Sequence, residues 1–341
     1  MPGFRCRTDR ACNVGGSVSD MATRDLQEEI ERLRLLRNSP ADSTTVATLR
    51  KTLKDRSNLM IAEAARITAE LHASELIPDL LHAYSRAFEN PVKTDPKCMA
   101  KTAIVHALTA LDYEISAPFL RGITHIQMEP VWAGQEDTAS LLRSACILAL
   151  PQCADLRRSE IFRLLIDALL DPVEPVRVDT VRAIEQMNGE EAQLLLRLKA
   201  RLGDSEPSVI GRVFDAVLNL EMGNGLAFVA GYLKSADSEI RDEAALAIGT
   251  SRQPAAANLL ITEWNNNIEP QFRSVLLRAI SASRAESGLE FLLSLVREGP
   301  LTQARSALEA LEFHQDSKDI QDRTERAIQQ RMRDGLPSIR D

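Results

Sequence analysis

The chain has 341 residues, of which 44% are hydrophobic and 4% are aromatic. This length and apolar content support a large buried core, which excludes a wholly disordered protein, and the low aromatic share disfavours a β-sandwich. The formal net charge of −8 argues against general nucleic-acid binding, because that binding depends on Lys and Arg side chains that neutralise phosphates.

The N-terminal end predicts a tail followed by a capping helix. Residues 1–20 contain no apolar stretch, so we expect a disordered tail and not a secretory signal. Translation starts at Met1 or at Met21, and the sequence does not decide between the two. Residues 21–37 predict a charged amphipathic helix with an apolar stripe too short for a coiled coil. We interpret residues 21–40 as the helix that caps one end of a repeat array.

Seven later segments share one helical pattern. They are 100–108, 142–150, 176–184, 209–217, 240–248, 272–280 and 303–311. Each has apolar residues on one helical stripe and alanine at its eighth position. These alanines, Ala107, Ala149, Ala183, Ala216, Ala247, Ala279 and Ala310, are separated by 42, 34, 33, 31, 32 and 31 residues. The small side chain predicts that neighbouring helices approach closely.

A second apolar stretch precedes each of these helices, and Asp, Ser and Pro residues between the two mark turns and helix caps. No alternating apolar pattern predicts a strand. We therefore predict an all-α fold of about eight antiparallel helix pairs over residues 41–313. Residues 314–341 predict a C-terminal capping helix and tail.

The segments LLDPVEPVRVDTVRAIEQM (169–187) and LKSADSEIRDEAALAIGTS (233–251) resemble HEAT repeats, especially the short bacterial repeats of phycocyanobilin lyases. The resemblance implies a HEAT-like solenoid, a right-handed α-α superhelix. It also implies a ladder in which a basic residue at the second helix position reaches an acid in the turn between helices. The implied ladder residues are Arg143, Arg177, Arg241 and Arg273, with Asp171, Asp204 and Asp237.

Catalytic and metal motifs are absent from the sequence as we interpret it. HEAT-type deoxyhypusine hydroxylases bind iron through His-Glu pairs, but none of the five histidines here precedes a glutamate. Neither these histidines nor the five cysteines have metal-ligand spacing. We expect no enzyme activity, cofactor or metal. Two alternatives stay open: a bilin-lyase-like enzyme or enzyme subunit acting on a bulky planar ligand, and, less favoured, a HEAT-like DNA glycosylase.

Two features are candidate partner-binding surfaces. The 42-residue gap predicts an inserted loop over residues 124–137 that contains Met128 and Trp132. Trp132 either contacts a partner or folds back over its own repeat, and both readings stay open. The seventh helix position lies off the buried stripe and includes residues of mixed charge, which suits a protein or peptide along a concave face. These residues are His106, Arg182, Asp215 and Arg278.

The sequence therefore predicts a protein-protein interaction scaffold. Its partner is a protein or peptide, neutral or basic because the repeat region is acidic. We expect no nucleic-acid binding, and no membrane insertion because no apolar run reaches the roughly 18–20 residues that span a bilayer. The odd number of cysteines, set among apolar residues, favours reduced thiols and a cytoplasmic protein.

Overall fold

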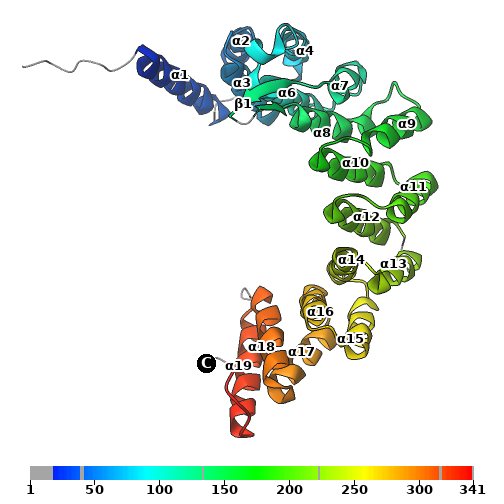
Figure 1. The fold of residues 1–341 in the computed structure, drawn as a ribbon. Coiled ribbons are helices and arrows are strands. Elements are labelled where there is room, and N and C mark those ends of the chain that lie inside the picture. The colour runs from blue at the N-terminus through cyan, green and yellow to red at the C-terminus, as the bar shows by residue number, and fades with distance from the viewer. Residues whose placement is uncertain (1–17, 39–41, 133, 222, 315–316, 340–341) are drawn as a thin grey trace, which may run out of the picture. The chain divides into compact units, whose positions relative to one another are not determined.

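The computed structural model describes residues 18–38, 42–132, 134–221, 223–314 and 317–339. These residues form nineteen α-helices, six short 3-10 helices and one two-stranded hairpin (Figure 1). The all-α prediction is confirmed, except that residues 128–137 contain the strands that we did not expect. The tail predicted for residues 1–20 lies outside the described residues up to residue 17, and a helix already begins at Val18.

The chain packs as two compact units, residues up to 146 with 152–155, and residues 147–151 with 156–341. The boundary falls within α8 (Ser140–Ala149), inside the array that the sequence predicts as one segment over 41–313.

The first unit contains α1 (Val18–Arg34), α2 (Ser43–Thr52), α3 (Asn58–Glu70), α4 (Ile77–Arg86), α5 (Pro91–Thr94), α6 (Met99–Ala110), α7 (Ala117–Ile123), strands β1 (Met128–Val131) and β2 (Gly134–Asp137), and most of α8. Helix α3 is central, because it packs against α1, α2 and α6. Tyr84 of α4 is buried and donates to the carbonyl of Pro118 at 3.1 Å, which joins α4 to the start of α7.

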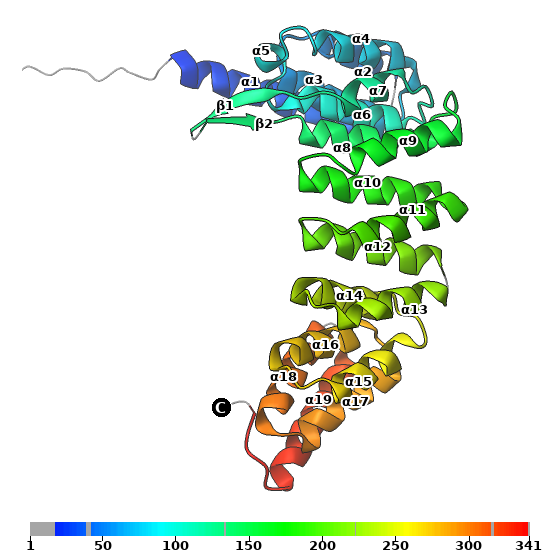
Figure 2. The ribbon, with the colours of Figure 1, turned by 45° about the vertical axis from the view of Figure 1, so that its right-hand side comes forward.

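The second unit contains α9 (Arg158–Ala168), α10 (Glu174–Met187), α11 (Gly189–Leu202), α12 (Pro207–Leu220), α13 (Asn224–Ala230), α14 (Ser238–Thr250), α15 (Ala256–Asn266), α16 (Pro270–Ala282), α17 (Glu286–Glu298), α18 (Leu301–Leu311) and α19 (Lys318–Arg333). The even-numbered helices α10 to α18 form one layer, here called the inner layer, in which each contacts the next. The odd-numbered helices α9 to α17 pack against it as a second layer, here called the outer layer (Figure 2).

All seven alanines at the eighth helix position are buried. Their small size allows neighbouring helices to pack closely. The approach is tightest between α14 and α16, where a methyl group added at Gly249 would lie 2.2 Å from the carbonyl oxygen of Ala279. Only a residue without a side chain fits this position without moving a backbone.

The capping helix predicted at the C-terminus is α19. It packs on α17, and its buried side includes Ile328 and, unexpectedly, Arg331, which is almost inaccessible to solvent. The Arg331 guanidinium donates to the carbonyl oxygens of Gly299 at 2.8 Å and Pro337 at 2.8 Å. These carbonyls offset the burial of the charge, because they replace water as acceptors for the Nε and Nη1 atoms.

Arg177 makes the ladder contact that the sequence implied. Its Nε and Nη2 atoms donate to the two carboxylate oxygens of Asp204 at 3.0 and 2.7 Å, and its Nη1 donates to the carbonyl of Asp171 at 2.8 Å. Lys199 adds a second cation 2.7 Å from Asp204. Burial alone would raise the pKa of Asp204, but Arg177 and Lys199 outweigh it and lower that pKa to about 2.

The other implied ladder residues behave differently. Arg241 pairs with Glu269 at 2.8 Å. Asp237 accepts hydrogen bonds from two backbone N–H groups at the start of α14 and therefore caps that helix. Arg273 stacks on the ring of Trp264, 3.6 Å from its centroid. Among the described residues, Asp237 and Arg273 make no ion pair, so neither forms the ladder contact that the resemblance implied.

Replacing Gly249 with Ala should destabilise the second unit by about 1–3 kcal/mol, because the new methyl group overlaps the backbone of α16. Urea denaturation followed by circular dichroism measures the change. Gly231→Ala is the matched control, since nothing lies within 4 Å of a methyl group there. Equal stability of the two variants would contradict the close packing of α14 on α16.

Asp204→Asn should cost about 2 kcal/mol at neutral pH, since the native carboxylate has a pKa lowered from 3.8 to about 2. A lowered pKa stabilises the fold above the unfolded value, and this contribution disappears as the pH falls from about 4 to about 2. Denaturation across that range should therefore show the two proteins converging. Asp237→Asn, which retains a good helix cap, should match the wild type throughout.

Candidate functional site

The insertion predicted as a loop over residues 124–137 contains a β-hairpin. Strands β1 and β2 are antiparallel, and their register pairs Met128 with Asp137 and Val131 with Gly134. In Figure 2 the hairpin stands out from the helices of the first unit as a ribbon. Four-residue strands on a helical protein require side-chain support, because an isolated hairpin is only marginally stable.

The hairpin has the reverse of the usual arrangement of polar and apolar side chains. Ile126, Met128 and Trp132 are exposed, and Trp132, directly after β1, is fully so. Gln127 and Glu129, which alternate with them, are buried. Half-buried strands normally direct apolar side chains inward and polar side chains outward. This hairpin is therefore anchored by polar contacts and presents its apolar side chains to solvent.

Glu129 is the centre of the anchor. Its Oε1 atom accepts hydrogen bonds from the backbone N–H of Lys97 at 2.6 Å, from Gln127 Nε2 at 2.6 Å and from Thr138 Oγ1 at 2.7 Å. Burial by itself would raise the pKa of Glu129, but these donors outweigh it and hold that pKa below its ordinary value. The carboxylate thus joins both strands to the segment before α6.

Lys101 of α6 supplies the buried positive charge next to Asp95 and Gln127. Its side chain is fully buried, and its Nζ atom lies 3.2 Å from Asp95 Oδ2, 3.0 Å from Gln127 Oε1 and 3.1 Å from the carbonyl oxygen of Ala87. Three acceptors match the three N–H donors of an ammonium group. Lys101 occupies the second position of its repeat helix, so the repeat supplies the cation to which the insertion is attached.

The start of α6 is shaped around Asp95. The Asp95 carboxylate accepts from the backbone N–H groups of Ala100 at 2.8 Å and Lys101 at 3.0 Å. To bring it there, the chain places Lys97 and Cys98 in the left-handed region, at φ 58° and 53°. Side chains other than glycine adopt this conformation only where their surroundings enforce it, and here the buried contacts do so.

Arg143 connects the hairpin to α8. Its guanidinium donates to Asp137 Oδ2 at 2.6 Å and to the carbonyl oxygen of His125 at 3.1 Å. Asp137 also accepts from the backbone N–H of Ala139, just before α8. Arg143, named as a ladder residue from the sequence, thus binds both ends of the inserted segment.

Burial shifts the pKa values of a thiol and an imidazole in the network. The buried Cys98 thiol donates to Gln127 Oε1 at 3.2 Å, and burial raises the pKa of Cys98 to about 12, which leaves it protonated at neutral pH. Burial also lowers the pKa of His125. Within the described ranges, no group of three or more His, Cys, Asp and Glu side chains is placed to hold a metal ion. The network therefore positions the hairpin.

Of the two readings of Trp132, the one in which it folds back over its repeat is wrong, because the side chain is fully exposed. Sequence reasoning identified Met128 and Trp132 but missed Gln127, Glu129 and Asp95. The alternation of apolar and polar residues from Ile126 to Pro130 is the signal that would have indicated a strand.

The other predicted contact residues lie on α6, α10, α12 and α16. Arg182 of α10 is exposed and pairs with Asp179 at 2.7 Å, and Asp215 of α12 lies 3.8 Å from Arg212. Arg278 of α16 is exposed, and all three belong to the second unit. His106 is exposed on α6 of the first unit, as are Met128 and Trp132 on the hairpin. The predicted residues thus form two groups, one in each unit.

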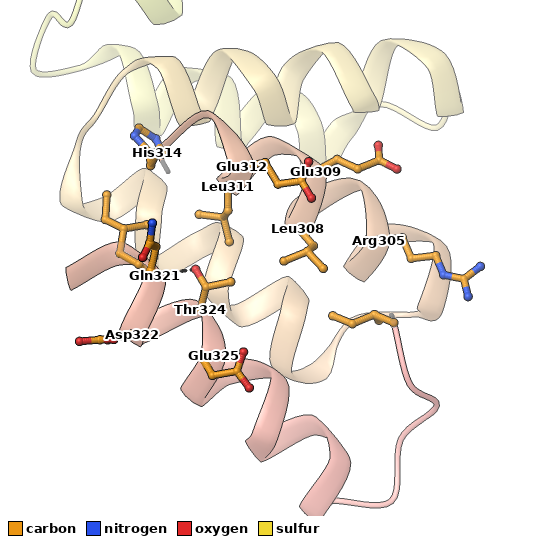
Figure 3. Close-up of a pocket in the computed structure, with 12 residues that line it drawn as sticks. Arg305, Leu308, Glu309, Leu311, Glu312, His314, Gln321, Asp322, Thr324 and Glu325 are labelled. Carbon is orange, nitrogen blue, oxygen red and sulfur yellow. Dashed lines mark hydrogen bonds between the residues drawn. The ribbon is translucent and has the colours of Figure 1, made fainter. Parts of the chain in front are cut away.

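A pocket of about 590 Å³ lies between α18 and α19 in the second unit. Figure 3 shows Leu308 and Leu311 of α18 pointing toward Thr324 and Glu325 of α19. Four carboxylates line the pocket against one arginine, Arg305; they are Glu309, Glu312, Asp322 and Glu325. An apolar floor with an acidic rim suits a basic side chain with an aliphatic stem.

Comparison with known proteins gives no family. No family model matches the chain, and no curated protein matches it. Among solved structures, human deoxyhypusine hydroxylase in complex with glycerol is 17% identical, covers 77% of this chain and 98% of its own, and has a TM-score of 0.29. An engineered protein is 14% identical, covers 91% of this chain and 96% of its own, and has a TM-score of 0.36. Likenesses this distant carry no functional argument.

A search for membrane spans gave none: across the described ranges, every helix is too short or too polar to cross a bilayer.

Lys101→Met should destabilise the first unit by about 3–5 kcal/mol, because it removes one partner of a buried ion pair and leaves Asp95 uncompensated. Urea denaturation followed by circular dichroism gives the value. Lys93→Met, at an exposed position eight residues earlier, should change stability by less than about 0.5 kcal/mol. A Lys101→Met protein as stable as Lys93→Met would refute the anchoring role of Lys101.

Proposed function

We propose that the protein is a non-enzymatic scaffold that binds a protein partner through its hairpin. The observation that carries the proposal is the full exposure of Trp132 on a strand pair that buried polar contacts hold in place. Exposed tryptophan is unfavourable in water but contributes strongly when a partner covers it. Because the hairpin is already ordered, binding costs little of the entropy that a flexible loop would lose.

The contact is made by side chains and not by strand addition. Pro130 in β1 lacks the N–H group that a further strand would need, and proline in a strand is tolerated where its nitrogen faces an open edge. The partner therefore offers an apolar cleft that receives Trp132 and Met128. Every second residue from 126 to 132 is apolar, so these side chains lie on one side of the strand.

A protein surface fits better than a membrane surface. The segment 124–138 contains Glu129, Glu136 and Asp137 but no lysine or arginine, so anionic lipid headgroups would repel it. The acidic pocket between α18 and α19 and the net charge of −8 support a neutral or basic partner and disfavour nucleic acid.

The proposed scaffold has further contact residues and a right-handed arrangement of its helix pairs. Arg182, Asp215 and Arg278 are further contacts on the inner layer, and the helix pairs follow the right-handed superhelix that the resemblance to HEAT repeats implies. The buried thiols of Cys98 and Cys146 favour a reducing compartment such as the cytoplasm.

Trp132→Ala and Met128→Ala test the hairpin in affinity purification from the native cell. Proteins recovered with the wild type should be lost with Trp132→Ala and reduced with Met128→Ala. With a purified partner, Trp132→Ala should weaken binding roughly 30-fold, as expected for a hot-spot residue worth about 2 kcal/mol. Ile115→Ala, an exposed aliphatic position of the same unit, is the matched control.

Two outcomes would overturn the proposal. One is recovery of the same proteins with Trp132→Ala as with the wild type and Ile115→Ala. The other is Trp132-dependent binding to vesicles of neutral and anionic lipids without any Trp132-dependent protein, which would make the hairpin a membrane contact.

A further inference from the structure

A second apolar surface lies on the outer layer of the second unit, far along the sequence from the hairpin. Leu194, Leu198 and Leu202 of α11 are 62%, 53% and 75% exposed. Their spacing of four residues places them along one face of the helix. Ile166, near the end of α9, and Leu170, two residues after that helix ends, are exposed as well. By contrast, the outer helices α13, α15 and α17 expose no large hydrophobic side chain within their described residues.

The two helices begin next to each other. Arg158, the first residue of α9, donates to the carbonyl oxygens of Met187 at 2.6 Å and of Asn188, directly before α11. The starts of α9 and α11 are therefore adjacent, and Figures 1 and 2 both show these helices side by side. Ile166 lies eight residues after the start of α9, and Leu198 lies nine residues after the start of α11. The two side chains are therefore at similar distances along their helices.

Charges at the ends of α11 indicate what covers this surface. Glu190 and Glu191 are exposed at its start, and Arg201 is exposed near its end, on the same side as the leucines. Arg201 makes no ion pair within the described part of the chain; its guanidinium lies 5.2 Å from the centre of the Phe228 ring. Glu191 makes one long contact of 3.4 Å, with Arg158.

This pattern is complementary to itself when reversed. An antiparallel copy of α11 centred on position 196 pairs Leu194 with Leu198 and Glu191 with Arg201, each twice, and places Leu202 level with Glu190 at the two ends of the contact. A twofold axis produces this arrangement, because each residue meets its counterpart from the other copy.

We infer that the protein forms a dimer in which α11 packs against α11 of a second copy, with Ile166 and Leu170 extending the apolar contact. A helix of 14 residues is about 21 Å long, so the contact is small compared with the roughly 1,600 Å² of a standard interface. The dimer is therefore weak and concentration-dependent. This inference does not depend on partner binding by the hairpin.

Sedimentation velocity of the full chain tests it. From low to high micromolar concentrations, the weight-average mass should rise from one chain toward two. Leu194→Ser with Leu198→Ser should keep the protein monomeric, and Ile268→Ser, an exposed aliphatic position elsewhere in the same unit, should dimerise as the wild type does. Circular dichroism checks that each variant is folded.

Charge exchange distinguishes the proposed pairing from unspecific association. Glu191→Arg and Arg201→Glu should each weaken the dimer at least about tenfold, because each places like charges opposite one another. The double variant restores complementary charges and should recover dimerisation. A mass of one chain at every concentration would overturn the inference, as would a folded double variant no better at dimerising than the single ones.

Discussion

Close contact between successive inner helices is the constraint on which the second unit depends. The buried alanines of α10 to α18 leave room for one backbone to approach another, and Gly249 opposite Ala279 is the extreme case. Packing of this kind tolerates no added volume, because protein interiors are as dense as organic crystals. The outer helices, ion pairs and caps are built around this layer.

The polar contacts within the units have two different uses. Arg177 and Asp204 join consecutive turns, and both side chains gain ionised partners that offset their burial. In the first unit, Lys101, Asp95, Gln127 and Glu129 form a buried network, and the cost of removing these groups from water offsets much of the attraction between them. Such a network instead fixes one arrangement, since each donor is satisfied only in the observed register of the hairpin.

That fixed register explains how an apolar side can face water. If the hairpin slipped by one residue, Ile126, Met128 and Trp132 would turn inward and the buried polar side chains would lose their partners. The cost of burying unsatisfied polar groups thus maintains the exposure of Trp132. The hairpin and the leucines of α11 are separate apolar surfaces, and their different charge patterns suit different occupants.

The sequence by itself determined the helices, because the 3.6-residue periodicity and the recurring alanine are local signals. It also identified Trp132, through the irregular repeat spacing, and the Arg177 contact, through the resemblance. Tertiary structure alone decided the hairpin, the burial of Lys101 and Glu129, and the stacking of Arg273 on Trp264. The physical reason is that the hairpin anchor joins polar groups 26 and 32 residues apart in the chain, and that Arg273 meets a ring on a different helix. Spacing along a helix carries no information about such partners.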